Sequence, residues 1–286
     1  MAIYSRKQLR QRLGTDLLQD THVGINAASL AASVSTGLIM DFALADPTFT
    51  ADTKYARAWV KHNGMVLRAA SFNFASGAFV SGQVAPTTTI AGGEYEIHEL
   101  LDPRDKDRAL DWSIDRLWVR QEVALAAVDG LFFYSVGYEF GRVYDWWVYG
   151  SPDGTGNRDK QSFIAQQPEI RMTGSGRELR LYGALTGSQQ IVLDAEVRLT
   201  LGTQDTATIN LPDNAYEQMV LYGAESQCWE MIAKRASAQD RRAYLTNAQR
   251  ASAAYSRLSQ RFAPQRDSAP RFRNPMPFSL PGARNE

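Results

Sequence analysis

The sequence contains little of what a disulfide-stabilised or secreted protein needs. Cys228 is its one cysteine among 286 residues, which excludes an internal disulfide. Because Cys228 stands next to Trp229 in a helical pattern, we interpret it as a buried structural thiol rather than a reactive one. The segment 1–12 alternates basic and polar residues and shows no secretory signal, so we expect folding in a reducing cytoplasm.

Imidazole bases are equally scarce, and the common catalytic motifs are missing. None of the three histidines lies in a recognisable catalytic pattern. The chain has no Gly-x-Ser-x-Gly elbow for a nucleophile, no His-Glu-x-x-His or paired cysteines for zinc, and no phosphate-binding loop ending in Lys-Ser/Thr. We therefore predict a protein that is not an enzyme, with no catalytic residues, no cofactor and no metal site. The histidines are His22, His62 and His98.

Long apolar runs and net charge are also missing. The longest apolar runs, at 131–134 and 191–193, are far shorter than the roughly 20 residues of a membrane-spanning helix, so no membrane span is predicted. Equal numbers of basic and acidic residues, 31 each, argue against a protein whose whole surface binds nucleic acid. The 44% of hydrophobic residues can fill the core of one large domain or two modest ones.

Two helix starts are visible in the first half of the chain. Ser5 and Gln8 have the spacing of a capping box and predict a short helix that ends at Gly14. Asp102, followed by proline at the first helical position, predicts a second helix whose apolar residues recur up to Trp118. Carboxylates at 105 and 107 could also hold a cation with Asp102, but acidic residues in a first turn are explained by the helix dipole.

The small-residue stretch within 15–36 fits a helix or a strand, and its structure stays open.

Short strands separated by turns dominate two other regions. In 54–99, Asn63-Gly64 is the pair typical of a type I′ hairpin, and further turns at 75–77 and 92–93 predict a three- to four-stranded meander. In the second region the firmest hairpin lies over 174–176. Strands are predicted there at 122–126, 131–136, 143–149, 169–173, 178–182, 191–201 and 206–209.

Two adjacent tryptophans stand in the second β-rich region. Because neighbouring residues of a strand face opposite sides, we expect one of Trp146 and Trp147 in the core and the other at an interface. A sugar-stacking platform is the alternative interpretation.

The C-terminal third predicts long helices. Asp213 is the expected N-cap, and small residues such as Gly223 in the apolar stripe would let another backbone approach closely. Beyond 237, an apolar seam steps by three or four residues and implies a partner helix from this chain or from a neighbour. The seam is Tyr244, Ala248, Ala251, Tyr255, Leu258 and Phe262. A separate helix face carries Arg250, Arg257 and Arg261.

After Phe262 the chain becomes proline-rich, and the prolines forbid a continuing helix or a central strand. Arginines and apolar residues alternate with the prolines, which suits an extended segment that docks along another protein's groove. An idle disordered tail is the alternative. The predicted partner-docking residues are Arg257, Arg261, Arg271, Phe272, Arg273, Met276, Phe278 and Leu280.

These patterns predict an α+β fold with a helical core, long C-terminal helices, antiparallel β segments and an extended Pro-rich tail. The expected parts are an N-terminal helical or extended segment (1–36), a small antiparallel β-meander (37–101), a core helix (102–119), a second β-rich segment (120–211), a long helical region (212–262) and an Arg/Pro-rich docking tail (263–286).

The order of these parts resembles that of the head-to-tail connector (adaptor) proteins of tailed bacteriophages. The resemblance covers most of 38–235: the segment Asp41 to Asp46 enters a small sheet, 92–98 closes it, and the helix from Asp102 and a second β segment follow. Leu211-Pro212 then opens a long amphipathic helix. The large inserted β segment and the long Pro-rich tail depart from the smaller members of that family.

The resemblance implies a structural virion protein at the neck, assembled in the host cytoplasm. Its implied partners are further copies of itself in a ring, commonly twelvefold, the portal protein, downstream tail or neck proteins, and genomic DNA that passes through the channel without sequence-specific binding. No membrane partner is implied. The alternatives are a tail-tube or tail-completion subunit, which should not need so long a terminal helical region, a carbohydrate- or receptor-binding β module, and a DNA-binding protein that uses the arginine face.

Overall fold

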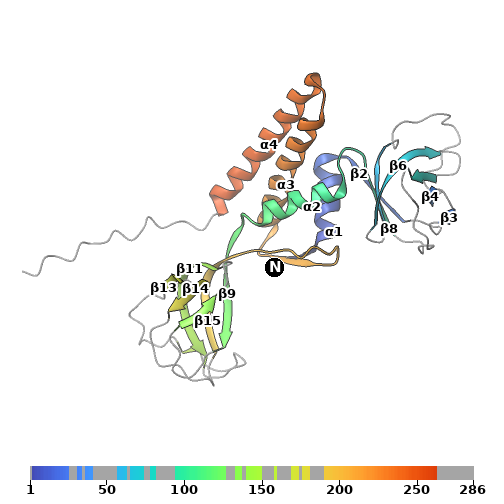
Figure 1. Cartoon of the computed structure of the whole chain (residues 1–286). Coiled ribbons are helices and arrows are strands. Elements are labelled where there is room, and N and C mark those ends of the chain that lie inside the picture. The colour runs from blue at the N-terminus through green and yellow to red at the C-terminus, as the bar shows by residue number, and fades with distance from the viewer. Residues whose placement is uncertain are drawn as a thin grey trace, which may run out of the picture.

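The structure, a computed structural model, places helices at the centre of the molecule and antiparallel sheets at two ends (Figure 1). The predicted α+β fold class is therefore confirmed. The tail from 263 onward and the segment Asp41 to Asp46 lie outside the described residues. The structure describes residues 2–25, 31–33, 36–40, 57–62, 65–73, 78–81, 94–126, 133–136, 140–149, 158–159, 169–173, 176–180 and 190–262.

The central helices begin where the sequence predicts. They are α1 (Arg6–Arg12), the π-helix η1 (Leu13–Leu18), α2 (Pro103–Ile114), α3 (Asn214–Arg235) and α4 (Ala238–Phe262). Ser5 and Gln8 form both hydrogen bonds of the capping box at α1. Asp102 caps α2, and the Asp213 carboxylate accepts from two backbone N–H groups of the first turn of α3. Each cap thus satisfies helix-end donors that would otherwise lack a partner.

The prediction that Gly14 ends the first helix is wrong. The helix continues as η1 to Leu18, and its C-cap Gln19 has a left-handed backbone with φ of 53°. Gly14 is buried, and a Cβ added there would lie 2.0 Å from the Thr21 side-chain oxygen. Glycine at this position therefore permits close approach between η1 and the following strand.

The core helix predicted at 102–119 is shorter than expected. It ends at Ile114, and Trp118 starts strand β9 (Trp118–Ala126). All nine residues of β9 pair antiparallel with β15 (Gln190–Arg198), from Trp118 opposite Arg198 to Ala126 opposite Gln190. The helical spacing of apolar residues extends four residues past the true helix end, to Trp118, but the pairing of the whole strand outweighs it.

The larger sheet has seven antiparallel strands. They are β2 (Thr21–Ile25), β3 (Ala31–Ser33), β4 (Thr36–Met40), β5 (Trp59–His62), β6 (Met65–Asn73), β7 (Ala78–Ser81) and β8 (Glu94–His98). The strand order is β2-β8-β5-β6-β7-β4-β3. The hairpin predicted around Asn63-Gly64 is confirmed by the pairing of His62 with Met65.

The prediction of a simple three- to four-stranded meander is wrong. β8 pairs with β2 and β5 instead of continuing from β7, and strands from the region 15–40 supply three members of the sheet. The stretch within 15–36, left open by its small residues, thus contains η1 and strands as well. These long-range pairings have no local signal, because each strand carries only its own alternation.

The second β region contains a four-stranded and a three-stranded sheet. Their strands are β9, β10 (Phe133–Val136), β11 (Phe140–Tyr149), β12 (Arg158–Asp159), β13 (Glu169–Thr173), β14 (Gly176–Arg180) and β15. The orders are β12-β11-β15-β9 and β10-β14-β13. The hairpin predicted over 174–176 is confirmed by Thr173 opposite Gly176. Strands β1 (Ala2–Ser5) and β16 (Thr208–Leu211) pair with each other.

The two adjacent tryptophans, Trp146 and Trp147, are both buried. Trp146 is 5% and Trp147 2% exposed, so both faces of β11 are covered at this point. The expectation that one of them lies at a surface interface is wrong. Neither ring is available as a platform on which a sugar could stack.

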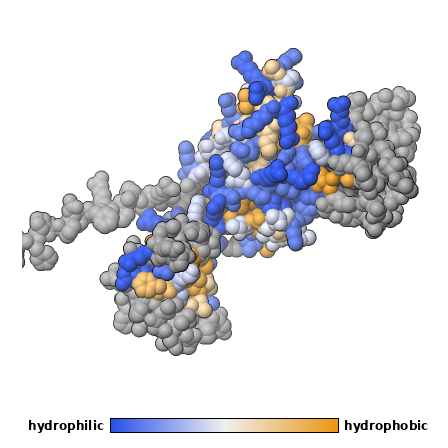
Figure 2. Space-filling model, in the orientation of Figure 1, coloured by the Kyte–Doolittle hydropathy of each residue, from blue (hydrophilic) through white to orange (hydrophobic). Residues whose placement is uncertain are grey.

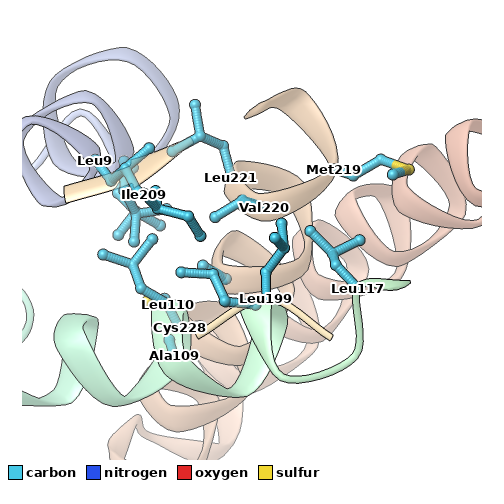
Figure 3. Packing of buried hydrophobic residues seen from close by; sticks show 14 of the residues in the cluster. Leu9, Ala109, Leu110, Leu117, Leu199, Ile209, Met219, Val220, Leu221 and Cys228 are labelled. Atoms are coloured by element: carbon cyan, nitrogen blue, oxygen red, sulfur yellow. The ribbon is translucent and has the colours of Figure 1, made fainter. Parts of the chain in front are cut away.

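One hydrophobic core joins α1, η1, α2, α3 and β16. Figure 3 shows its side chains converging between these elements, with Leu9 near Ile209 and Leu110 near Cys228. Cys228 is fully buried, as predicted, and burial raises the pKa of its thiol well above the ordinary value. The thiol therefore acts as a small apolar group in the core.

The partner of the C-terminal apolar seam is α3 of the same chain. Tyr244 stacks on Trp229 with ring centroids 5.7 Å apart, and the Ser226 hydroxyl donates to the carbonyl oxygen of Ala248 over 3.2 Å. Ala248 and Ala251 are buried between the helices. α3 and α4 therefore form an antiparallel hairpin whose seam is satisfied internally.

Gly223 is the point where α3 meets α2 and α4. A Cβ at this position would lie 2.2 Å from the hydroxyl oxygen of Ser113 and 3.3 Å from a ring carbon of Tyr255. Gly223→Val should therefore lower the free energy of unfolding by about 2–3 kcal/mol, because the buried helices must move apart. Gln218→Val, at an exposed position of α3, is the control and should cost under about 1 kcal/mol. Urea denaturation measures both, and equal stabilities for the two variants would contradict this close packing.

Candidate functional site: the C-terminal helical hairpin

The α3–α4 hairpin extends from the central helices away from the two sheets (Figure 1). In the space-filling view, hydrophilic residues dominate the visible side of this projection (Figure 2). Its two helices have 22 and 25 residues. Much of the surface of α4 is exposed.

The side of α4 that points away from α3 is exposed along its whole length. At about 100° per residue, nine residues lie within one third of the helix circumference, opposite the apolar seam. We call these nine residues the outer face. They are Gln239, Arg242, Ala243, Thr246, Arg250, Ala253, Arg257, Gln260 and Arg261, and all nine are exposed.

Three arginines of the outer face lack the ion pairs that several other arginines of the described residues form. Within the described residues, Arg242, Arg250 and Arg257 form no ion pair. By contrast, Arg120 of β9 pairs with Asp194 of β15 at 2.5 Å, and Arg235, at the end of α3, pairs with Asp105 of α2 at 2.7 Å. These three arginines of the outer face therefore present uncompensated positive charge.

A shallow groove runs between α3 and α4 on one flank of the hairpin. Small side chains form most of its wall, Leu245 is 43% exposed beside it, and Glu230, Lys234 and Arg241 supply charges of both signs. The lining residues are Ser226, Glu230, Ala233, Lys234, Arg241, Leu245, Ala248, Gln249, Ser252, Ala253 and Ser256.

The structure places two of the eight predicted docking residues. Arg257 and Arg261 lie on the outer face together with Arg250, as helical spacing predicts. Arg242 belongs to the same face, and its signal in the sequence was a helix with five arginines and no lysine. The other predicted docking residues, Arg271, Phe272, Arg273, Met276, Phe278 and Leu280, lie outside the described residues.

A second polar feature, which sequence reasoning missed, is a buried group of charges between the larger sheet and the helices. Arg10 is fully buried and binds Glu96 of β8 through two hydrogen bonds of 2.8 and 2.9 Å. Its guanidinium also donates to Asp107 at 2.9 Å and to Asp205 at 2.8 Å. Burial alone would raise the pKa of Glu96, but hydrogen bonds from His98 and Arg10 hold that pKa well below its usual value.

His98 connects this arginine to a second buried ion pair. Its Nε2 lies 3.0 Å from Glu96, and its Nδ1 lies 3.0 Å from the ammonium of Lys106, which pairs with Asp20. Because an ammonium can only donate, Nδ1 accepts and the ring is neutral with its proton on Nε2. Burial lowers the pKa of His98 to about 4, and the Lys106 charge acts in the same direction against the raising effect of Glu96.

The cluster ties α1 and α2 to strand β8 and to the turn before β16. Thr21 completes it: its hydroxyl lies 2.7 Å from the Lys106 ammonium, which requires the close approach that Gly14 permits. The side chains of Arg10, Glu96, His98 and Lys106 are all buried. The cluster therefore fixes the larger sheet on the central helices.

A signal for the cluster is present in the sequence but is ambiguous. Glu96 and His98 alternate with Tyr95 and Ile97, as in a strand with one face in water, yet all four residues are buried. Lys106 likewise precedes Leu110 by one helical turn and faces the core. Only the packing of the helices against the sheet decides that these polar faces are interior.

Among the described residues, no group of three or more histidine, cysteine, aspartate or glutamate side chains could hold a metal ion. No helix in the described ranges is both long and apolar enough to cross a membrane. Comparisons with family models, with curated proteins and with solved structures gave no match to this chain.

Proposed function

We propose that the chain is a structural subunit of an oligomeric ring, expected to be twelvefold, that joins the capsid portal of a tailed bacteriophage to its tail around the DNA channel. The observation that carries this proposal is the projecting hairpin. Its inner seam is satisfied within the chain, while all nine residues of its outer face are exposed. The central helices, flanked by two separate β regions, also offer different surfaces to different neighbours, as head-to-tail contacts in a ring require.

Two alternatives receive less support. A tail-tube or tail-completion subunit should not need terminal helices as long as the 22 and 25 residues of α3 and α4. A carbohydrate-binding module that uses the adjacent tryptophans is disfavoured because both rings are buried.

We also propose that the role is not enzymatic. His98 is buried, and both of its ring nitrogens are engaged by Glu96 and Lys106. A buried imidazole whose two nitrogens are both hydrogen-bonded within the protein cannot reach a proton on a bound substrate, so we assign His98 a structural role.

Removal of the tail tests the proposed function. A chain that ends at Phe262 should keep its circular dichroism spectrum and melting temperature, because the described core and hairpin lie before that residue. It should fail to bind the cognate portal in a co-purification assay with native mass spectrometry, whereas the full chain should bind as a ring. A chain with the residues of 263–286 in scrambled order is the matched control for tail composition and should also fail. Normal portal binding by the truncated chain would contradict the docking role of the tail, and a full chain that never forms rings with the portal would contradict the proposed function.

A further inference from the structure

The zero net charge of the protein conceals a strong separation of charge. Residues 238–286 contain nine arginines, no lysine and three acidic residues, which gives this part a net charge of +6. The remaining 237 residues carry the balancing −6. The overall neutrality of the chain therefore does not exclude nucleic-acid binding by its C-terminal part.

Within that part, the outer face of α4 collects four of the five arginines of the helix. The one acidic residue of α4, Asp240, lies outside this face and accepts a hydrogen bond from the Ser237 hydroxyl at 2.8 Å. Within the described residues, the charges of Arg242, Arg250 and Arg257 are thus neither neutralised by a carboxylate on the same face nor paired across the hairpin.

The other residues of the outer face help to identify the partner. Between the arginines stand only glutamine, threonine and alanine, with no aromatic residue, no large aliphatic residue and no carboxylate. Protein interfaces bury aromatic and aliphatic anchors at their centre. Arginine, glutamine and threonine without such anchors are instead the residue types that contact nucleic-acid phosphates.

We propose that the outer face of α4 binds the sugar–phosphate backbone of duplex DNA without reading its sequence. This inference rests on the proposed function, since it names the surface of the ring subunit that meets the genome. From Arg242 to Arg261 the face extends about 28 Å along the helix axis, which is most of one turn of a DNA duplex. A straight helix of this length can meet both phosphate backbones, which carry one charge per about 1.7 Å of duplex axis.

The test uses the full-length chain and a fluorescently labelled 30-base-pair duplex of random sequence, followed by anisotropy between 20 and 150 mM NaCl. The triple variant Arg242→Gln/Arg250→Gln/Arg257→Gln should bind the duplex about tenfold more weakly at the lowest salt. The slope of log K against log salt should become shallower by about 2.7, or 0.9 for each phosphate contact removed.

A matched control removes the same charge from other exposed positions. Arg57→Gln/Arg108→Gln/Arg142→Gln lies outside the hairpin and should leave both the affinity and the salt slope unchanged. Equal effects of the two triple variants would overturn the proposal, and so would a wild-type chain that does not bind the duplex at 20 mM salt. An unchanged salt slope combined with loss of portal binding would show that the outer face docks an acidic protein instead.

The DNA-binding and portal-binding assays together distinguish a wrong DNA contact from a wrong proposed function. A chain that forms portal-bound rings but shows no dependence of DNA binding on the three arginines overturns only the DNA contact. A chain that binds DNA through them but forms no ring with the portal overturns the proposed function.

Discussion

Arg10→Met is expected to lower the free energy of unfolding by about 3–5 kcal/mol, because removing one partner of a buried ion pair leaves the other charge uncompensated. Glu96, which is 2% exposed, would lose two hydrogen bonds and keep His98 and a longer contact of 3.3 Å from the Gln11 amide. The Asp205 carboxylate would be less destabilised than Glu96, since it also pairs with the Lys61 ammonium at 2.7 Å. The measurement is urea denaturation at pH 7 followed by far-ultraviolet circular dichroism.

Two further variants make this prediction specific to the buried pair. Lys7→Met removes a partly exposed ion pair with Glu94, also between α1 and β8, and should cost at most about 1 kcal/mol. Adding Glu96→Gln to Arg10→Met removes the stranded charge and should restore part of the lost stability. A cost for Arg10→Met no larger than that of Lys7→Met would contradict the role assigned to the cluster.

The second large effect is a loss of stability in mild acid that depends on His98. The pKa of His98 is about 4 in the folded protein, below the ordinary 6.5, so the unfolded chain binds the proton more readily. Stability should therefore fall as pH drops from about 6.5 towards 4, by about 3 kcal/mol from this one group. The ring cannot accept a second proton without placing it against the Lys106 ammonium 3.0 Å away.

His98→Gln should remove this part of the acid dependence. The difference between its unfolding free energies at pH 7 and pH 4.5 should be smaller than that of the wild type by about 2.5 kcal/mol. Glu96 contributes little to the difference in stability between pH 7 and pH 4.5. Its pKa is lowered in the folded protein, so its stabilising effect is lost only as pH falls below the ordinary carboxyl range. His22→Gln, in the neighbouring strand, should retain the wild-type dependence. A His98→Gln protein with an unchanged acid dependence would contradict the assignment.

Local features of the fold were predictable because their signals lie within a few residues. The capping residues Ser5, Asp102 and Asp213 all act as predicted. So do the hairpins around 63–64 and 174–176. A cap needs only the N–H groups of the next turn, and a tight hairpin needs only its own turn residues, so distant packing scarcely affects either.

Features that depend on distant partners were the ones predicted wrongly. Trp118 continues a helical pattern but pairs with Arg198 across a sheet, and β8 bypasses β7 to join β5 and β2. The seam of α4 predicted a partner helix, yet only the structure shows that this partner belongs to the same chain. The outward position of Arg250 and Arg257 follows from helical spacing once that partner is known.

The sequence by itself thus determined the α+β class, the helix starts, the tight hairpins and the arginine-bearing face of α4, since these follow from local hydrogen bonding and periodicity. The tertiary structure alone decided the strand order, the burial of Trp146 and Trp147, and the interior position of Arg10, Glu96, His98 and Lys106. The physical reason is the same in each case. Whether a polar face meets water or a partner charge depends on which element covers it, and here the paired residues lie 86 positions apart in the chain.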